Sequence, residues 1–398
     1  MFGQKINTDK DKINDILTRS VAEIIEKGSV EKKLASGKQL RIKLGIDPTA
    51  PHIHIGRAVV LWKMRALQEL GHKVVIIIGD FTGLVGDTSD KKSERPMLTE
   101  AEIKKNMKLY LSEIGKIIDI KKAEVHYNSK WLSKLGFLEI AKQADQFSVH
   151  DFISRELIAK RLEEGKRISL RELLYPLMQG YDSVAINADI EMGGTDQKFN
   201  ILAGRVMQRL YGKKEQDVFL CDIIEGLDGE KMSTSKGNGI FIVDTPQDMY
   251  GKVMSLKDSL IISYFIHTTR VDRGVIRGFE EELRNGKNPK EIKMILAREL
   301  VSLYHGVKEA DKAEKEFQRI FEKGGTPEDV TTIEVREINE VLAHLIKKEV
   351  VASASEWHRL VKEGAISVEG NRIDSVSSIK SGDVIKIGKR RFVKVVIL

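Results

Sequence analysis

Two histidines stand one residue apart in the stretch GIDPTAPHIHIGRAV, where His52 and His54 precede an apolar pattern typical of a helix. Residues two apart on a strand can share a metal ion, but no neighbouring cysteine or paired carboxylate completes a zinc set. The alternative is an anion site. A helix that begins near Gly56 offers free N–H groups and the positive end of its dipole, and His54 can donate to a phosphoryl oxygen. The sequence favours the anion site, and we expect no metal ligands.

A second cluster of charged residues lies in the loop EKMSTSKGNG, where Lys231 and Lys236 accompany three hydroxyl side chains. The glycines and serines of this stretch do not sustain a helix, so we expect a mobile loop. A charged surface loop has this composition. A phosphate clamp needs the same ingredients, because it uses cations on a loop that closes over a triphosphate. The residues alone leave both interpretations open.

A polar trio stands out in the apolar stretch YPLMQGYDSV. Tyr175, Gln179 and Asp182 are spaced at i, i+4 and i+7, so on a helix they share one face. Such a face either meets solvent or lines a polar pocket, and the residues do not decide between the two.

Glycine-rich turns follow two apolar segments. The turn GDFTGLVGD ends at Asp87, and the turn GGTDQ contains Gly194, Asp196 and Gln197. At the C-terminal edge of an open α/β sheet such turns bind ligands, because glycine lets a ligand approach the backbone. The alternative is an ordinary turn with an aspartate cap, and we expect Asp196 to cap the helix that follows it.

A parallel sheet would bring these residues together, and the hydrophobic pattern predicts one. Residues 13–25 have helical spacing, LRIKLGI alternates as a strand, residues 59–70 form a second helix, and KVVIIIGD is an apolar strand. This strand, helix and strand unit indicates an α/β fold with a Rossmann-like parallel sheet. Further strands are expected in SVAINADIEMGG and DVFLCDIIEGL.

The other segments predict the domain organisation. Residues 91–171 are charged and helical in pattern, so we expect a helical insertion within a Rossmann-like domain of residues 1–240. Helical patterns predict an α-helical domain over residues 241–325. The Gly, Pro and Asp cluster in KGGTPEDVTT predicts a linker, residues 326–338, before a small α+β module, residues 339–398.

The composition narrows the class of protein. The chain has 398 residues and one cysteine, Cys221, so no intrachain disulfide is possible. The N-terminus is polar and no run of about 18 apolar residues occurs, so we expect neither a signal peptide nor a membrane span. A cytoplasmic protein is therefore expected. Its net charge of +7 favours an anionic partner.

Most of the positive excess lies near the C-terminus, where residues 341–398 hold 11 basic and 6 acidic side chains. Ser353 can cap a helix that ends at Gly364, and the strand-like stretches AISV and DVIKI follow. Four polar side chains of this module are candidates for RNA contacts, with a solvated surface as the alternative: Arg359, Lys362, Asn371 and Arg372.

The ordered set of motifs resembles the class I aminoacyl-tRNA synthetases, and among them the bacterial-type tyrosyl-tRNA synthetases. HIGR is similar to the HIGH signature of that class and KMSTS to its KMSKS signature, while DPTAPHIHIG, TGLVGD, YPLMQGYD and GGTDQ match further blocks in order. The similarity covers nearly the whole chain. It implies a catalytic domain, a helical domain on the anticodon side and an RNA-binding tail.

The resemblance implies an ATP-dependent aminoacyl-tRNA ligase that activates tyrosine to tyrosyl-adenylate and transfers it to the terminal ribose of tRNA(Tyr). Mg²⁺ would accompany ATP as part of the substrate complex, with no prosthetic group, and the protein would be a homodimer. The resemblance assigns catalytic roles at the phosphates to Thr49, His54, Lys231 and Lys236. It assigns further ATP contacts to Asp47, Gly56, Arg57, Gly194, Asp196, Met232, Ser233, Thr234 and Ser235.

The amino-acid pocket follows from the same resemblance. The phenol hydroxyl of tyrosine would donate to Asp182, and the amino group would lie near Tyr175, Gln179, Asp87 and Gln197. A pocket with a polar partner for the hydroxyl rejects phenylalanine, because that partner would otherwise stay buried and unpaired.

Three residues depart from the pattern of the family. Arg57 stands where the second histidine of HIGH is expected, Thr234 replaces the second lysine of KMSKS, and Lys43 occupies a place where many members have a tyrosine that touches the substrate hydroxyl. Two alternatives remain. One is a tryptophan-specific relative, which shares the two signatures, and the other is a non-catalytic RNA-binding protein on a synthetase scaffold, which the altered HIGR and KMSTS strings favour.

Overall fold

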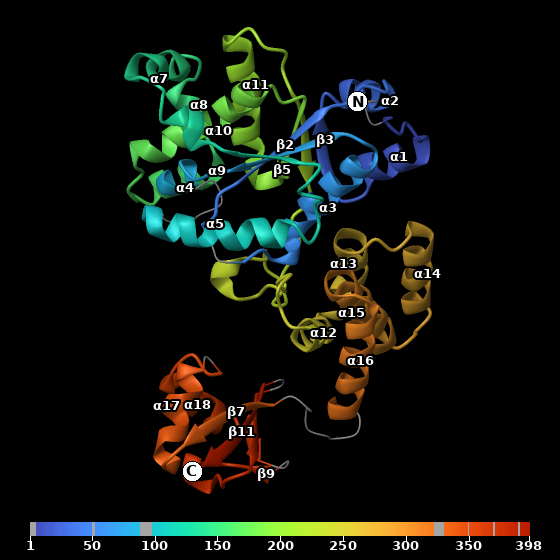
Figure 1. Ribbon diagram of the computed structural model, residues 1–398, viewed down its shortest axis with the longest axis vertical. Helices are drawn as coiled ribbons and strands as arrows, with labels where there is room; N and C mark the ends of the chain where they lie inside the picture. The colour runs from blue at the N-terminus through green and yellow to red at the C-terminus, as the bar shows by residue number, and fades with distance from the viewer. Residues whose placement is uncertain are drawn as a thin grey trace. The chain divides into compact units, whose positions relative to one another are not determined.

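The computed structural model describes residues 5–49, 52–87, 98–321, 330–348, 350–368, 371–388 and 391–398 (Figure 1). The chain forms two compact units. The first comprises Met1–Val243 and Leu256–Pro289, and the second comprises Asp244–Ser255 and Lys290–Leu398.

The first unit is built on a six-stranded sheet with the order β1, β6, β5, β2, β3, β4. All neighbours are parallel except β1 and β6, which are antiparallel. The strands are β1 (Val21–Ile25), β2 (Arg41–Ile46), β3 (Lys73–Ile78), β4 (Glu124–Tyr127), β5 (Ile190–Gly194) and β6 (Asp217–Cys221). Consecutive residues of β3 and β6 are buried, so both faces of the sheet are covered, as expected for a parallel sheet. The predicted α/β fold is confirmed.

The register of the central strands aligns the loops that follow them. Ile46 at the end of β2 pairs with Ile78 at the end of β3, so Asp47 and Gly79 start their loops side by side. A Cβ atom on Gly79 would lie 1.9 Å from Asp47 Oδ1 and 2.3 Å from Thr82 Oγ1. Only glycine at this position lets the two polar side chains approach the end of the strand.

Helices surround this sheet: α1 (Lys10–Thr18), α2 (Lys27–Ala35), α3 (Ile55–Glu69), α4 (Thr82–Val85), α10 (Leu170–Ile186), α11 (Lys198–Leu210), α13 (Ile261–Thr268) and α14 (Arg273–Arg284). The predicted helix over residues 13–25 is wrong in its second half, where β1 lies. Ser20 adopts a left-handed φ of 54°, which ends the helical run. The branched residues that follow then pair with β6.

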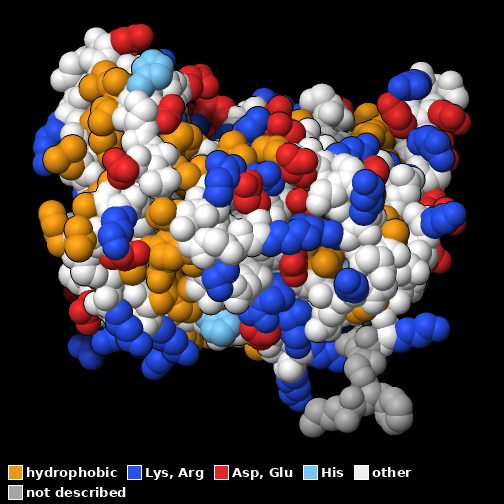
Figure 2. Space-filling view, turned by 90° about the horizontal axis from the view of Figure 1, so that it is seen from above, with side chains coloured by type: hydrophobic (Ala, Val, Ile, Leu, Met, Phe, Trp, Pro, Cys, Tyr) orange, Lys and Arg blue, Asp and Glu red, His pale blue; other side chains and the backbone are white. Residues whose placement is uncertain are grey.

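The expected insertion carries α5 (Glu100–Ile114), α6 (Ser129–Leu132), α7 (Phe137–Ala144), α8 (Val149–Ile153) and α9 (Glu156–Glu163). It is not wholly helical, because β4 lies within it and extends the sheet beside β3. Several large apolar side chains of α7, α8 and α10 are exposed: Phe137, Leu138, Val149, Leu170 and Leu174. Hydrophobic side chains gather on the left of the molecule in Figure 2, the side on which α7 and α8 lie in Figure 1.

The second unit contains α12 (Pro246–Met254), α15 (Pro289–His305) and α16 (Val307–Phe321). The predicted helical segment of residues 241–325 is therefore shared between two units, since α13 and α14 belong to the first.

The C-terminal part of the second unit has a sheet of the order β7, β11, β10, β8, β9. Its elements are β7 (Thr331–Val335), α17 (Val341–Lys347), α18 (Ala354–Lys362), β8 (Ile366–Val368), β9 (Asn371–Arg372), β10 (Val384–Ile387) and β11 (Arg391–Ile397). Strand β7 falls inside the predicted linker of residues 326–338 and pairs in parallel with β11. The module thus begins before residue 339, while residues 326–329 lie outside the described part of the chain.

Candidate active site

A cavity of about 470 Å³ opens at the carboxyl ends of the central parallel strands. This is the edge at which open α/β sheets bind their ligands. The structure brings most of the predicted site residues to its wall: Asp47, Thr49, His54, Gly56, Arg57, Asp87, Tyr175, Gln179, Asp182, Gly194, Asp196, Gln197, Lys231, Met232, Ser233 and Thr234. Lys236 does not line the cavity, and the side chain of Ser235 lies outside the described residues.

His54 begins helix α3 as its N-cap residue, and its Nδ1 accepts a hydrogen bond from the backbone N–H of Arg57 at 3.3 Å. Burial and the positive charges of Arg57 and Lys231 lower the pKa of His54 to about 3. The imidazole is therefore neutral, and with Nδ1 accepting, the proton lies on Nε2. His54 can donate one hydrogen bond to an anion without carrying a charge itself.

Helix α5 of the insertion holds the segment around His54. The guanidinium of Arg57 donates to the hydroxyl of Tyr110 at 2.8 Å. The buried carboxylate of Glu113 accepts from the backbone N–H of Ile53 and pairs with His52 Nδ1, both at 2.7 Å. His52 is thus a support of the loop. Tyr110 and Glu113 were not among the predicted site residues, because nothing in the pattern of α5 marks two residues that contact a segment so far away in the chain.

Lys231 lines the cavity and donates to Asp196 Oδ2 at 3.0 Å. Asp196 belongs to a short 3₁₀ helix, Thr195–Gln197, and α11 starts at Lys198 without a side-chain cap. The expected capping role of Asp196 is therefore wrong, since its carboxylate faces the lysine of the KMSTS loop. Lys236 forms its ion pair with Glu230 on the surface.

Tyr175 and Asp47 both line the cavity and are hydrogen-bonded to each other. The Tyr175 hydroxyl donates to Asp47 Oδ2 at 2.8 Å, and Thr82 Oγ1 donates to Asp47 Oδ1 at 2.7 Å. Burial and the carboxylate of Asp47 raise the pKa of Tyr175 well above its ordinary value, so the phenol keeps its proton. Asp47 is thereby fixed between α4 and α10.

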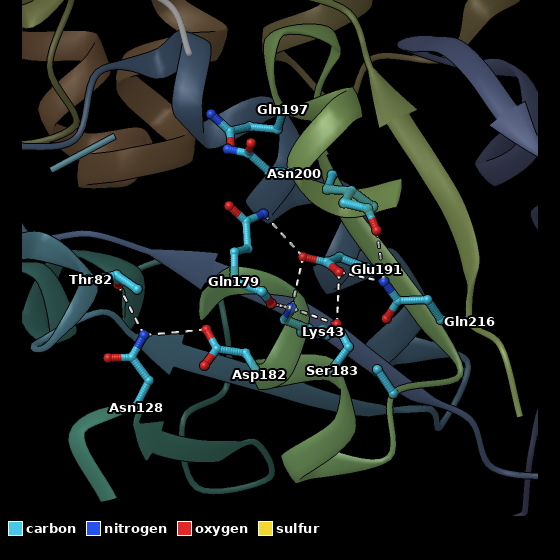
Figure 3. Close-up of polar contacts among 12 residues, drawn as sticks. Lys43, Thr82, Asn128, Gln179, Asp182, Ser183, Glu191, Gln197, Asn200 and Gln216 are labelled. Atoms are coloured by element: carbon cyan, nitrogen blue, oxygen red, sulfur yellow. Dashed lines mark hydrogen bonds and ion pairs between the residues drawn. The ribbon is translucent and has the colours of Figure 1, made fainter. Parts of the chain in front are cut away.

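Asp182 is buried on the same face of α10 and accepts two hydrogen bonds from residues of the insertion. Trp131 Nε1 donates to Oδ1 at 2.7 Å, and Asn128 Nδ2 donates to Oδ2 at 3.3 Å. Burial raises the pKa of Asp182 to about 7, against the opposing effects of Lys43 and the two donors. Asn128 also donates to Thr82 Oγ1 at 3.0 Å (Figure 3), which links Asp182 with Thr82.

Two glutamines also line the cavity. Gln197 donates to Asp87 Oδ2 at 2.8 Å, and Gln179 donates to Glu191 Oε1 at 3.3 Å. Lys43 does not line the cavity. It is fully buried beneath the wall and forms an ion pair with Glu191 at 2.9 Å.

The C-terminal module places its four candidate residues on the surface. Ser353 caps α18 by accepting from the backbone N–H of Glu356, as the sequence predicts. The exposed side chains are Arg359 and Lys362 on α18 and Asn371 and Arg372 on β9. Arg359 pairs with Glu363 at 2.9 Å, one turn along the helix.

Residues 35–322 match the family model of class I tRNA synthetases for tryptophan and tyrosine. The fold is thus that of the class I aminoacyl-tRNA synthetases. A tyrosine–tRNA ligase from Moorella thermoacetica is 44% identical over 95% of this chain and 94% of its own length. A second one, from Carboxydothermus hydrogenoformans, is 44% identical over 96% of this chain and 97% of its own length. The chain belongs to the tyrosine–tRNA ligase family, and the resemblance seen in its motifs is confirmed.

Solved structures support the fold. The C-terminally truncated mitochondrial tyrosyl-tRNA synthetase of Aspergillus nidulans has a TM-score of 0.66, with 22% identity over 79% of this chain and 95% of its own. The tyrosyl-tRNA synthetase of Archaeoglobus fulgidus, complexed with L-tyrosine, has a TM-score of 0.61, with 21% identity over 76% of this chain and 99% of its own.

Proposed function

We propose that the protein activates tyrosine with ATP to form tyrosyl-adenylate and pyrophosphate, and then transfers tyrosine to the terminal ribose of tRNA(Tyr). The family supports the reaction class. The observation that carries the amino-acid specificity is the carboxyl group of Asp182, which is buried at the wall of the cavity and held in place by Trp131 and Asn128.

The first step needs no general base, because the carboxylate of tyrosine is already ionised at neutral pH. It attacks the α-phosphorus of ATP, the bond to the pyrophosphate breaks, and pyrophosphate leaves with the electron pair. Positioning and stabilisation of charge on the phosphoryl oxygens must therefore supply the rate. Neutral His54 donates one hydrogen bond from the start of α3, and Lys231, whose charge acts on His54, brings a positive charge to the same cavity. Thr49 lies on the same wall.

Mg²⁺ enters with ATP in this proposal and serves as part of the substrate. The oxygen donors that surround the cavity fit this role only in part, because Asp47 and Asp196 already accept hydrogen bonds from Tyr175 and Lys231. In the described ranges no group of three His, Cys, Asp or Glu residues is placed to hold a metal. The phosphates of ATP and water would then provide most ligands.

In this proposal, the part of the cavity around Asp182 distinguishes tyrosine from its analogues. Asp182 offers an acceptor to the phenol hydroxyl, and phenylalanine would leave this buried group without a partner from the substrate. Asp87 and Gln197, which are hydrogen-bonded to each other, lie on the same cavity and suit the α-ammonium group. The remaining ATP contacts fall to Gly56, Arg57, Gly194, Met232, Ser233 and Thr234.

RNA and a second copy of the chain are the macromolecular partners in this proposal. Arg359, Lys362, Asn371 and Arg372 are exposed on the basic C-terminal module and suit phosphate and ribose contacts. The exposed apolar side chains on α7 and α8 suit contact with a second copy of the chain. Among them, Phe137 is 89% exposed and Leu138 is 72% exposed. Such a patch in water is typical of a protein interface.

The compartment proposed is the cytoplasm. The single cysteine, Cys221, is buried and free, which suits a reducing environment. Across the residues that the structure covers, no helix is long and apolar enough to cross a membrane.

The test is aminoacylation of bacterial tRNA with labelled tyrosine, tryptophan or phenylalanine. The proposal expects ATP-dependent charging with tyrosine alone. Charging with tryptophan alone would support the tryptophan-specific alternative. Binding of tRNA without charging by any of the three amino acids would support the RNA-binding scaffold and contradict the proposal.

A further inference from the structure

A buried ion pair lies directly beneath the amino-acid side of the cavity. Lys43 on β2 and Glu191 on β5 are paired residues of two adjacent parallel strands, and their charged atoms are 2.9 Å apart. Their side chains are 0% and 1% exposed. Taking two charges out of water is costly, so a pair at this depth requires an explanation beyond packing.

The ammonium group of Lys43 has three partners. Besides its ion pair with Glu191, it donates to the backbone carbonyl of Gln179 at 2.9 Å and to Ser183 Oγ at 2.7 Å. Gln179 and Ser183 lie on α10 on either side of Asp182. Lys43 therefore ties the sheet to the segment of α10 that faces the cavity (Figure 3).

The carboxylate of Glu191 is held in the same network. It accepts from Gln179 Nε2 at 3.3 Å, from Ser183 Oγ at 3.0 Å and from Gln216 Nε2. Gly204 of α11 leaves the necessary space, because a Cβ atom there would lie 2.4 Å from Gln216 Nε2 and 2.9 Å from Ser183 Oγ. The network is thus built into the packing of α10 and α11 against the sheet.

The two charges act on Asp182 in opposite directions. The positive charge of Lys43 lowers the pKa of Asp182, and the negative charge of Glu191 raises it. Trp131 and Asn128 donate to Asp182 from the insertion, and the protonated phenol of Tyr175 lies on the same helix. Lys43 and Glu191 are the two charged groups beneath it.

We infer that Lys43 and Glu191 are specificity-determining positioning residues: together they fix the segment of α10 that carries Gln179 and Asp182, and their charges set how strongly Asp182 accepts the hydroxyl of tyrosine. The inference rests on the proposed function, in which Asp182 binds that hydroxyl. Neither residue touches the substrate.

The test is tyrosine-dependent exchange of pyrophosphate into ATP, measured over a range of pH around neutrality for the wild type, Lys43→Met, Glu191→Gln and the double variant. Removing Lys43 should raise the KM for tyrosine by at least about tenfold and leave the KM for ATP unchanged. The midpoint of the pH profile of kcat/KM for tyrosine should rise in Lys43→Met and fall in Glu191→Gln. The double variant loses both charges, so its midpoint should return towards the wild type.

Lys33→Met is the control, because it breaks another ion pair of the same unit that is largely buried, Lys33 with Asp217 at 2.9 Å, away from the cavity. Its midpoint should equal that of the wild type. If the two residues had a purely structural role, the single variants would lose activity, but the midpoints of their pH profiles would not shift in opposite directions. Midpoints that stay fixed or move in the same direction would therefore overturn the inference. If Lys43→Met does not fold, the midpoint of the pH profile of Glu191→Gln still tests the inference, which predicts that this midpoint falls. Absence of tyrosine-dependent exchange in the wild type would instead refute the proposed function.

Discussion

The guanidinium of Arg57 donates to the hydroxyl of Tyr110 at 2.8 Å, so a helix of the insertion holds the residue that replaces the second histidine of the HIGH signature. Tyr110 is fully buried, and both residues line the cavity. An arginine at this position carries a permanent charge and a planar set of donors. We propose that the contact with Tyr110 orients these donors towards ATP.

Tyr110→Phe tests this contact. The variant keeps the ring and removes the hydroxyl, which should cost about 1 kcal/mol and raise the KM for ATP about fivefold. The KM for tyrosine should stay unchanged. Steady-state exchange kinetics measure both values. Arg57→Lys should have the same effect as Tyr110→Phe, since a lysine lacks the planar guanidinium. An equal rise in the KM for tyrosine would instead show that the contact between Arg57 and Tyr110 only supports packing.

The protonation of Asp182 predicts a pH dependence of activity. A pKa of about 7 means that the carboxylate, the acceptor for the substrate hydroxyl, is lost as pH falls below neutrality. The kcat/KM for tyrosine should therefore decrease through this range. In Asp182→Asn the profile should lose this step, together with most of the discrimination against phenylalanine. An unchanged step in the variant would assign the titration to another group.

The protonation of Asp182 also predicts how the stability of the fold depends on pH, and this trend is opposite to that of the activity. The pKa of Asp182 rises from 3.8 in a solvated chain to about 7 in the folded state, so the folded protein binds this proton more tightly. The contribution of Asp182 to the stability of the fold is therefore complete below the pKa of the unfolded state. It is lost as the pH rises from there towards the pKa of the folded state. Thermal unfolding at a series of pH values, compared between the wild type and Asp182→Asn, should show this decrease only in the wild type.

The two lysines of the KMSTS loop should differ in their effects. Lys231 lines the cavity beside Asp196, whereas Lys236 pairs with Glu230 on the surface. We expect Lys231→Met to slow tyrosyl-adenylate formation about a hundredfold, the effect of losing one donor to a developing charge. Lys236→Met should have a much smaller effect. Single-turnover adenylate formation measures both, and equal losses would contradict the assignment.

The RNA-binding proposal predicts a change in salt dependence. Replacing Lys362 and Arg372 by alanine should weaken tRNA binding and reduce the slope of log affinity against log salt by about two, one for each phosphate contact. Adenylate formation should not change. Lys394→Ala, which removes another exposed lysine of the same module, is the control. An unaltered slope in the double variant would show that this surface does not meet RNA.

The sequence predicted the parts of the site that follow from strand order. The stretches LRIKLGI and KVVIIIGD form β2 and β3, and their aligned ends place Asp47 and Gly79 at one edge, as any pair of parallel strands does. The i, i+4 and i+7 spacing correctly placed Tyr175, Gln179 and Asp182 on one face of a helix, and the structure shows that this face lines the cavity.

The supporting contacts could not be read from the sequence. Tyr110, Glu113, Asn128 and Trp131 reach the site from an insertion whose helical pattern is set by its own packing, so no periodicity distinguishes them. Lys43 was recognised as a departure, but its partner Glu191 becomes visible only when β2 and β5 are adjacent. The left-handed Ser20, which ends the first helix, has no local signal either.

The most direct measurement of the central claim is amino-acid-dependent exchange of pyrophosphate into ATP by the wild-type protein, with tyrosine, tryptophan and phenylalanine compared at neutral pH. The arrangement of Asp182 at the cavity predicts exchange with tyrosine and little with the other two. Exchange with tryptophan alone, or with none of the three, would contradict the account.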